Sequence, residues 1–246
     1  MEVHHHPEPG KKTFKEYLLE GLMIFLAVTM GFLAESLREY ITDKEKERQY
    51  VSSLINDIKQ DSANLAGAIE ENKRKLKGLN VVLSLSKRNL DEPANRKLLY
   101  ENAGNSISYY SSFSSNDATM MQLKNAGGLR LIRRSHVADS IARYDIEIRG
   151  IAGAEKPYGK SIEDALESLQ QILDFTAIDD SSYYRQGHFT DKKLPILWTD
   201  SLHLKMFYNR VSVERGWTEN YLRNMESRLP FVCRMISFLQ KQYDID

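Results

Sequence analysis

Three groups of residues in this 246-residue chain have types and spacings that could do chemistry. His4-His5-His6 stands before Pro7, and imidazole is a common ligand of transition metals. Ser135-His136 with Asp139 combines the hydroxyl, imidazole and carboxylate of nucleophilic catalysis. Gly153–Ser161 ends in Gly-Lys-Ser, as a phosphate-binding loop does. The chemistries to weigh are therefore metal binding, nucleophilic catalysis and nucleotide binding.

None of the three groups has the surroundings that its chemistry needs. Adjacent histidines on a flexible leader have no preformed geometry and no supporting second layer of partners. Five residues instead of four separate Gly153 from Gly159, and no parallel-sheet pattern follows them. Ser135 lacks the sharp turn that exposes a nucleophile, while His188 and His203 stand alone in the sequence. We predict no catalytic residue, no metal and no cofactor.

The apolar segment Glu16–Arg38 is the most informative element of the chain. Gly21–Ala34 carries no charge, but as a helix it spans only about 21 Å, whereas Tyr17–Leu37 spans about 31 Å and fits a bilayer core. The length predicts an uncleaved single-pass transmembrane helix over 16–38, after a flexible leader over 1–15. A buried core helix and a signal peptide are the alternatives. Acidic residues before the run, and no small-x-small cleavage site after it, disfavour the signal peptide.

The small and acidic residues of this segment share one side of the predicted helix. At about 100° per residue, six residues gather in or beside one narrow wedge: Glu20, Ala27, Gly31, Ala34, Glu35 and Arg38. Ala27-x-x-x-Gly31 has the spacing that lets two membrane helices approach closely. We predict an interface with another copy or another membrane protein here, and contact with the lipid bilayer elsewhere. Glu20 and Glu35 either mark the membrane borders or line an ion path.

The charge pattern limits the classes of partner and predicts the orientation of the chain in the membrane. The chain has 34 basic and 34 acidic residues, so no global field attracts nucleic acid, and we predict no nucleic-acid partner. Basic residues nearly balance across the apolar segment. We predict that the N-terminus lies inside, because the lysines before the helix form a cluster close to it and long downstream domains translocate regardless of charge. The single cysteine, Cys233, excludes an intrachain disulfide and is expected in the core.

The remaining sequence predicts an all-α fold, with residues 39–246 as one helical soluble domain. The transmembrane helix is expected to continue to about Arg88, because apolar residues recur at spacings of three and four. These residues are Leu37, Ile41, Val51, Ile55, Ile58, Leu65, Ile69, Leu76, Leu79 and Leu83. Polar residues, including Lys44 and Asn72, interrupt the series. Because a polar seam weakens a stalk of paired copies, we expect packing against later helices of the same chain.

Shorter helices are expected after Pro93. Capping residues and apolar spacing place them over about 94–102, through Met120–Leu123, from Ser135 to Ile148, from Ser161 to Leu173 and from Asp200 to Gln242. Glycines and Pro157 predict a break over 150–159, and Pro230 predicts a kink or split. The Ser- and Tyr-rich stretch 106–115 is expected to be a loop. Its tyrosines, and the aromatic set Tyr183, Tyr184, Phe189 and Trp198, are either core residues or a binding surface.

Two stretches of the sequence carry a family resemblance. FLAVTMGFLAESLREYITDKEKERQYVSSLINDIKQD joins an apolar helix to a charged one, and Thr119–Ile132 carries a Gly-Gly turn and a Leu-x-Leu-Ile step. Together with Ile141 and Tyr144 they resemble an uncharacterised family of single-pass bacterial membrane proteins. Ala126 stands where that pattern has serine, and Met120 where it has an aromatic residue. The resemblance implies a helical architecture and no activity, and with it the expected location is the bacterial inner membrane, with a periplasmic helical domain.

We expect a non-enzymatic, membrane-anchored scaffold, sensor or accessory subunit that acts through homo-oligomer or partner contacts. One alternative is a channel-like homo-oligomer whose pore is lined by the Glu20/Gly31/Glu35 face. The other is a membrane-tethered enzyme, which requires a deep polar pocket with a perturbed acid or histidine. A binding module requires an exposed aromatic patch and no such pocket.

Overall fold

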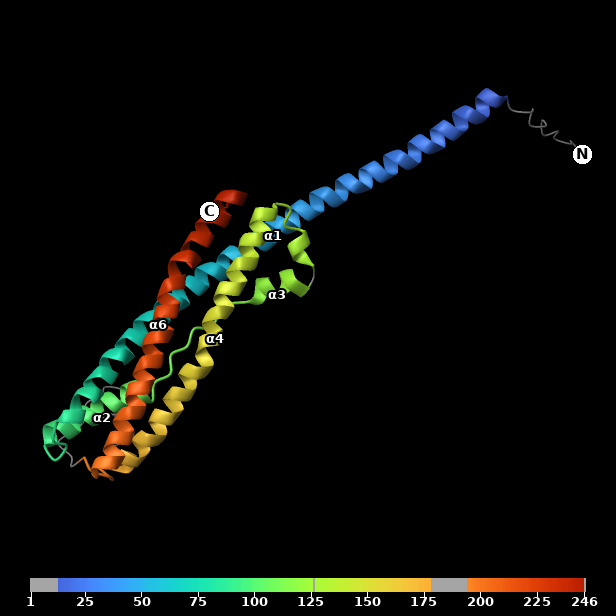
Figure 1. The fold of residues 1–246 in the computed structure, drawn as a ribbon. Helices are drawn as coiled ribbons and strands as arrows, with labels where there is room; N and C mark the ends of the chain where they lie inside the picture. The colour runs from blue at the N-terminus through green and yellow to red at the C-terminus, as the bar shows by residue number, and fades with distance from the viewer. Residues whose placement is uncertain (1–12, 126, 178–193, 246) are drawn as a thin grey trace, which may run out of the picture. The chain divides into compact units, whose positions relative to one another are not determined.

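The computed structural model describes residues 13–125, 127–177 and 194–245. Two compact units divide the chain, Met1–Gln49 and Tyr50–Asp246. The described residues form helices, with one isolated bridge between Leu173 and Ile196, so the all-α prediction is confirmed. The helices are α1 (Phe14–Ser84), α2 (Pro93–Ile107), α3 (Ala118–Asn125), α4 (Ser135–Ile172) and α6 (Ser201–Tyr243), with short 3-10 turns at Leu85–Lys87, Gly128–Arg130 and Phe175–Ala177 (Figure 1).

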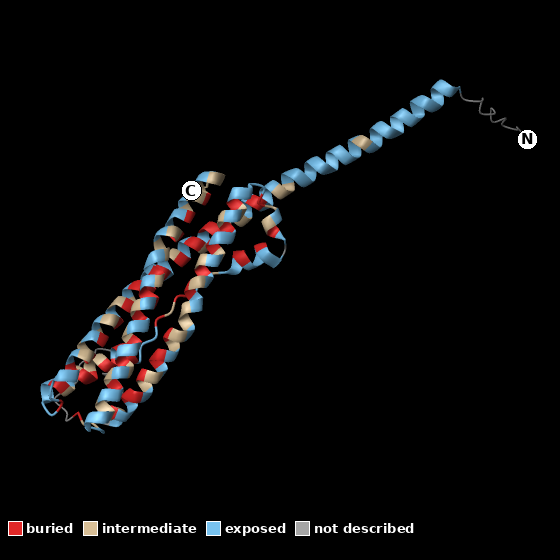
Figure 2. Ribbon diagram, in the orientation of Figure 1, coloured by how far each residue is buried: buried red, intermediate tan, exposed pale blue. Residues whose placement is uncertain are grey.

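The first unit holds the apolar part of α1. Among the described residues this is the one helix that is long and apolar enough to cross a membrane, and no residue of its apolar window is buried. Every residue from 14 to 41 except Thr29 is exposed, as the pale blue ribbon shows (Figure 2). The predicted membrane-length helix near the N-terminus is confirmed. The alternative of a buried core helix is wrong, because these side chains have no protein around them.

In the second unit, α1 packs against later helices of its own chain. Val51, Ile58 and Leu65 are fully buried and belong to a cluster that also holds Tyr144 and Met225. Leu79 and Val82 belong to a second cluster, which forms around α2 and the first half of α6. The predicted intramolecular packing of this part of the long helix is confirmed. Asn72, the polar seam residue, is buried inside the unit.

α4 is one continuous helix of 38 residues, so the predicted break over 150–159 is wrong. Pro157 removes one backbone donor, and its i−4 partner is Gly153, whose carbonyl loses its helical bond. The buried stripe nevertheless continues across this region, from Ile148 and Ile151 to Tyr158 and Ile162, at helical spacing. Packing of a continuous apolar stripe stabilises the helix more than one lost hydrogen bond destabilises it.

α6 also runs unbroken through a proline. Pro230 is exposed and lies inside the 43-residue helix, so the predicted split is absent. Val232 and Met235 continue the buried face beyond it. Cys233 is exposed, which corrects its expected place in the core, and its Sγ lies 3.4 Å from Ser62 Oγ. The neighbouring Val232 takes the buried position instead.

An extended segment over residues 109–117 connects α2 to α3, drawn in green in Figure 1. The prediction that the Ser- and Tyr-rich stretch is a loop is confirmed for these residues. Parts of the segment are buried, including Ser111 and Phe113. Extended backbone without a neighbouring strand must find its hydrogen bonds elsewhere. Side chains of the surrounding helices supply them, which explains the polar residues found inside this domain.

Candidate functional site

The predicted interface residues of the membrane helix lie on exposed surface of α1. Glu20, Ala27, Gly31, Ala34 and Glu35 are all exposed, and a Cβ added at Gly31 would meet nothing within 4 Å. Glu35 forms an ion pair with Arg38, one turn further along the helix. The small residues therefore leave a shallow, open face between longer side chains. Contact of this face with another chain remains a prediction.

A second exposed face lies on the first half of α6. Leu202, Met206, Val213 and Trp217 are between 38% and 63% exposed, at spacings of four, seven and four residues. This series is called the α6 stripe below. The intervening positions of the same face are Asn209, Gly216 and Asn220, so the face carries no charge. A surface apolar stripe without charge is typical of a contact site.

Sequence reasoning missed the α6 stripe, because it assigned the apolar residues of this helix to a buried face. The buried face is a different one, formed by Phe207, Val211, Thr218 and Tyr221. The signal was nevertheless present in the sequence. A heptad series without charge appears in a chain that is 28% charged, next to a separate series that supplies the core.

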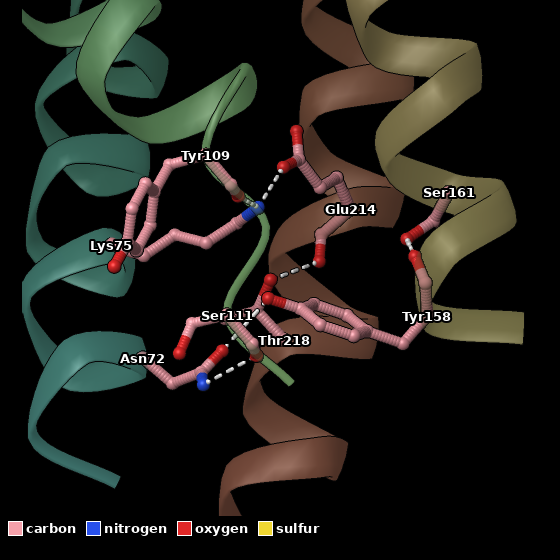
Figure 3. A network of polar contacts seen from close by, with 8 residues as sticks. All are labelled: Asn72, Lys75, Tyr109, Ser111, Tyr158, Ser161, Glu214 and Thr218. Atoms are coloured by element: carbon pink, nitrogen blue, oxygen red, sulfur yellow. Dashed lines mark hydrogen bonds and ion pairs between the residues drawn. The ribbon is translucent and has the colours of Figure 1, made fainter. Parts of the chain in front are cut away.

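A buried ion pair lies at the centre of the second unit. Lys75 Nζ of α1 is 2.8 Å from Glu214 Oε1 of α6, and both side chains are fully buried. Lys75 Nζ also donates to the backbone carbonyl of Tyr109 at 2.6 Å and lies 5.3 Å from the centre of the Tyr158 ring. Figure 3 shows the ammonium between the carboxylate and the extended segment. The pair therefore joins α1, α6 and that segment.

Burial acts on both members of this pair. It raises the pKa of Glu214 to about 7, although the neighbouring Lys75 opposes the shift. It lowers the pKa of Lys75, and Glu214 opposes that shift in turn. Glu214 Oε2 has no hydrogen-bond partner among the described residues. Glu214 is thus an acid that titrates near neutrality inside the protein.

Asn72 and Tyr158 form a second set of contacts with the extended segment. Asn72 Nδ2 donates to the carbonyl of Ser111 at 3.0 Å, and Asn72 Oδ1 accepts from the Tyr158 hydroxyl at 2.8 Å (Figure 3). Tyr158 stacks on Tyr221, with ring centres 4.7 Å apart, and the backbone N–H of Phe113 donates to the Tyr221 hydroxyl at 3.0 Å. Three buried side chains, one from each of three helices, thus position two residues of loop backbone.

Two aspartates of α1 hold the end of the same segment. Asp61 accepts from the backbone N–H of Asn116 at 2.6 Å and from the Tyr144 hydroxyl at 2.5 Å. Asp57 accepts from the backbone N–H of Thr119, in the first turn of α3, at 3.0 Å. Burial raises the pKa of Asp61, and its hydrogen bonds oppose the shift. These aspartates replace the backbone partners that the extended segment and the start of α3 lack.

These polar residues bind the protein's own backbone. Lys75 lines a surface groove of about 700 Å³ between α1 and α2, but its ammonium is already engaged by Tyr109 and Glu214. Glu214 is the perturbed acid that the enzyme alternative requires, yet its side chain has no exposed surface. The arrangement can hold or release a proton at Glu214, and it gives a substrate no access to that carboxylate. Sequence reasoning missed both residues, although each lies in phase with buried apolar neighbours on its helix.

The other sequence candidates are placed apart from one another. His136 Nε2 lies 3.1 Å from Gln242 Oε1, and no hydrogen bond joins it to Ser135 or Asp139 in the described structure. His203 Nδ1 contacts Asp200 at the start of α6 and its ring lies against Trp198. Residues 153–161 lie inside α4, so they form neither a phosphate loop nor the predicted turn. The described residues contain no group of three or more potential metal ligands.

Several predicted features lie outside the described residues. These are the histidines of the leader at 4–6, His188, and the aromatic residues Tyr183, Tyr184 and Phe189. Comparison of the chain with protein-family models, curated proteins and solved structures finds no match. The family resemblance of the sequence therefore remains a prediction, and the geometry of this chain alone carries the argument about function.

Proposed function

We propose that this protein is a non-enzymatic, membrane-anchored scaffold, sensor or accessory subunit that acts through contacts between copies or with another membrane protein. The exposed apolar part of α1 is the observation that carries the proposal. Burying it in a bilayer removes large side chains such as Leu22, Phe25 and Leu33 from water, at roughly 25 cal/mol per Å² of apolar surface. The lipid bilayer is the first partner.

The second partner meets the small face of the same helix. Ala27 and Gly31 let a neighbouring helix approach closely, and close packing is what drives helix association inside lipid. A second copy suits this face because two copies anchored in one bilayer lie parallel and present the same residues at the same depth. The ion pair of Glu35 with Arg38 supports a border position for this glutamate over a place in a pore.

The α6 stripe supports a contact role for the helical domain. It is an exposed apolar patch with one aromatic residue, Trp217, as its largest side chain. Its lack of charge suits pairing with an identical surface, since a copy meets no like charges. Two anchors in one membrane raise the effective concentration of such weak faces. We place the protein in the bacterial inner membrane, with the helical domain in the periplasm and no nucleic-acid partner.

Mass determination of the detergent-extracted full-length protein tests this proposal. The variants are Gly31→Leu, which fills the small face, and Thr29→Leu, which places the same leucine side chain on the opposite side of the helix at nearly the same depth. We expect a discrete oligomer for the parent and for Thr29→Leu, and a smaller species for Gly31→Leu.

The outcome separates the alternatives. A monomer for all three proteins would exclude both the oligomeric scaffold and the pore, and would leave a heterologous partner for the helical domain. An oligomer unaffected by Gly31→Leu would move the contact away from the membrane helix, and the α6 stripe would be the next surface to change.

A further inference from the structure

A cavity of about 390 Å³ lies where α1 ends and α6 begins in the second unit. Its wall includes the 3-10 turn after α1, the loop before α2 and the first two turns of α6. The volume falls within the range of small-molecule sites. No residue discussed so far as an interface or as part of the buried polar cluster lines it, so it is independent of the proposed function.

Two cations line this cavity without a partner. Arg88 and Lys205 form no ion pair or side-chain hydrogen bond with the described residues. Asp91 is the one carboxylate among the described lining residues, and it pairs with Arg96 at 3.4 Å. The cavity wall therefore keeps two positive charges that nothing in the described structure balances. An anion is the complement of such a wall.

Tyr208 adds a buried donor to the same cavity. Its hydroxyl is buried and has no hydrogen-bond partner among the described residues. An unsatisfied buried hydroxyl costs roughly 1–3 kcal/mol, so it calls for an explanation in a folded protein. Burial raises the pKa of this phenol to about 12, so it stays protonated and can donate at neutral pH. Because the hydroxyl has almost no exposed surface, it can donate to a bound anion only when the Tyr208 side chain turns it toward the cavity.

Three leucines give the wall an apolar part, beside the polar side chains of Ser86, Asn89, Thr199 and Ser201, and this apolar part narrows the class of ligand. Leu85 and Leu90 are buried, and Leu204 lies across from them on α6. Inorganic ions have nothing to gain from leucine side chains, whereas an apolar group attached to the anion does. We propose that this cavity binds a small organic anion, a carboxylate or phosphate carrying an apolar group, through Arg88, Lys205 and the Tyr208 hydroxyl.

Binding of phenyl phosphate and of benzoate to the full-length protein in detergent micelles tests the proposal, by calorimetry and by thermal unfolding. Inorganic phosphate and neutral benzyl alcohol serve as comparison ligands. We expect at least one of the two organic anions to bind and to raise the unfolding temperature, as any ligand of the folded state does. Inorganic phosphate should bind more weakly because it has no apolar group to contact the leucines. Benzyl alcohol should bind more weakly because it has no negative charge to meet the two cations.

Variants assign the binding to this cavity. Arg88→Gln with Lys205→Gln should weaken the affinity tenfold or more, at about 1.4 kcal/mol per tenfold. The matched control, Arg223→Gln with Lys59→Gln, changes exposed cations that line no part of this cavity and should leave the affinity unchanged. Tyr208→Phe should weaken the affinity without destabilising the ligand-free protein, because it removes a hydroxyl with no partner.

Two results would overturn the assignment. One is that neither organic anion binds up to millimolar concentration. The other is that binding persists undiminished in the Arg88/Lys205 double variant, which would place the ligand elsewhere. Neither result bears on the proposed oligomer. The cavity is lined by no residue of the membrane helix and by none of the four residues of the α6 stripe.

Discussion

At the scale of single residues, Lys75 and Glu214 are buried where an apolar pair would pack without loss of hydration. A buried ion pair is weak evidence for stability, because desolvation of two charges offsets their attraction. Lys75 has a further task, since its ammonium donates to the Tyr109 carbonyl of an extended segment that no strand accompanies. We interpret the pair as a positioning device for residues 109–117.

The pH dependence of stability follows from Glu214. Its folded pKa of about 7 lies above the ordinary value of 4.5, so between these pH values the folded chain holds a proton that the unfolded chain has lost. Stability is therefore expected to fall as pH rises through this window, on the order of 1 kcal/mol per pH unit. Burial lowers the pKa of Lys75, and this shift has the opposite effect on stability below the ordinary lysine pKa of 10.5.

Chemical unfolding of the full-length protein between pH 5 and pH 8 measures this slope. Glu214→Gln should flatten it. Burial also raises the pKa of Asp61, which adds a decrease of the same sign above that residue's ordinary pKa of 3.8. An equal slope in parent and variant would mean that Glu214 keeps an ordinary pKa in the folded protein.

The sequence indicated few of these residues, for a physical reason. Periodicity identifies which face of a helix is buried, and it placed Val51, Ile58 and Leu65 correctly. Periodicity does not show which residue a charged side chain on that buried face will contact. Lys75 and Glu214 are 139 positions apart, on different helices. Their meeting depends on how three helices and a loop pack together, which local patterns do not contain.

At the scale of elements, α1 and α2 lie close together at Gly78. A Cβ added there would lie 1.7 Å from Ser106 Oγ and 2.9 Å from Ser106 Cβ, whereas a Cβ added at Gly67 of the same helix meets nothing within 4 Å. Gly78→Ala should therefore destabilise the domain by roughly 1–3 kcal/mol through overpacking. Gly67→Ala should stabilise it by about 1 kcal/mol, because alanine is the better helix former.

Denaturant unfolding of the two alanine variants beside the parent protein measures both effects. Opposite signs for two identical substitutions in one helix are the specific expectation. Stabilisation by Gly78→Ala would contradict the close contact between α1 and α2.

The continuity of α4 leads to a second prediction about the helices. Pro157→Ala restores the backbone donor that the Gly153 carbonyl lacks, and should stabilise the protein by about 1–3 kcal/mol. Pro93→Ala is the matched control, because Pro93 is the first residue of α2, where proline is favourable and no helical bond is missing. It should give no gain. If 150–159 were a turn, as glycine and proline counts alone suggest, Pro157→Ala would give no gain either.

The same helix shows what sequence patterns can and cannot decide. Gly150, Gly153, Pro157 and Gly159 are all unfavourable in a helix, and a local interpretation places a break there. The buried positions of α4 keep their spacing of three and four across the whole region, and that longer pattern was the better guide. Local propensity was overridden because the helix packs along its length on α6.

At the scale of the whole molecule, we propose a membrane anchor joined to a helical domain that carries its own contact face. Length and apolar composition sufficed to predict an exposed helix long enough to cross a membrane near the N-terminus. The α6 stripe was missed, because composition does not distinguish an exposed apolar face from a buried one. The cavity lined by Arg88 and Lys205 was also beyond sequence reasoning, since the end of one helix and the start of another meet there.

The predicted orientation has a direct test in Cys233. It is the single cysteine of the chain and it is exposed, so a membrane-impermeant maleimide reports the side of the membrane on which it lies. We expect labelling in bacterial cells whose outer membrane has been opened and whose inner membrane is intact. Cys233→Ser should abolish the signal. Labelling that requires lysis of the inner membrane would place the helical domain in the cytoplasm.

Disulfide crosslinking in native membranes tests most directly whether copies meet through the small face of the membrane helix. In a Cys233→Ser background, Ala27→Cys places a thiol on that face and Thr29→Cys places one on the opposite side, at nearly the same depth. We predict that mild oxidation yields a crosslinked dimer for Ala27→Cys and little or none for Thr29→Cys. Equal crosslinking at both positions, or none at either, would contradict a specific contact between copies through this face.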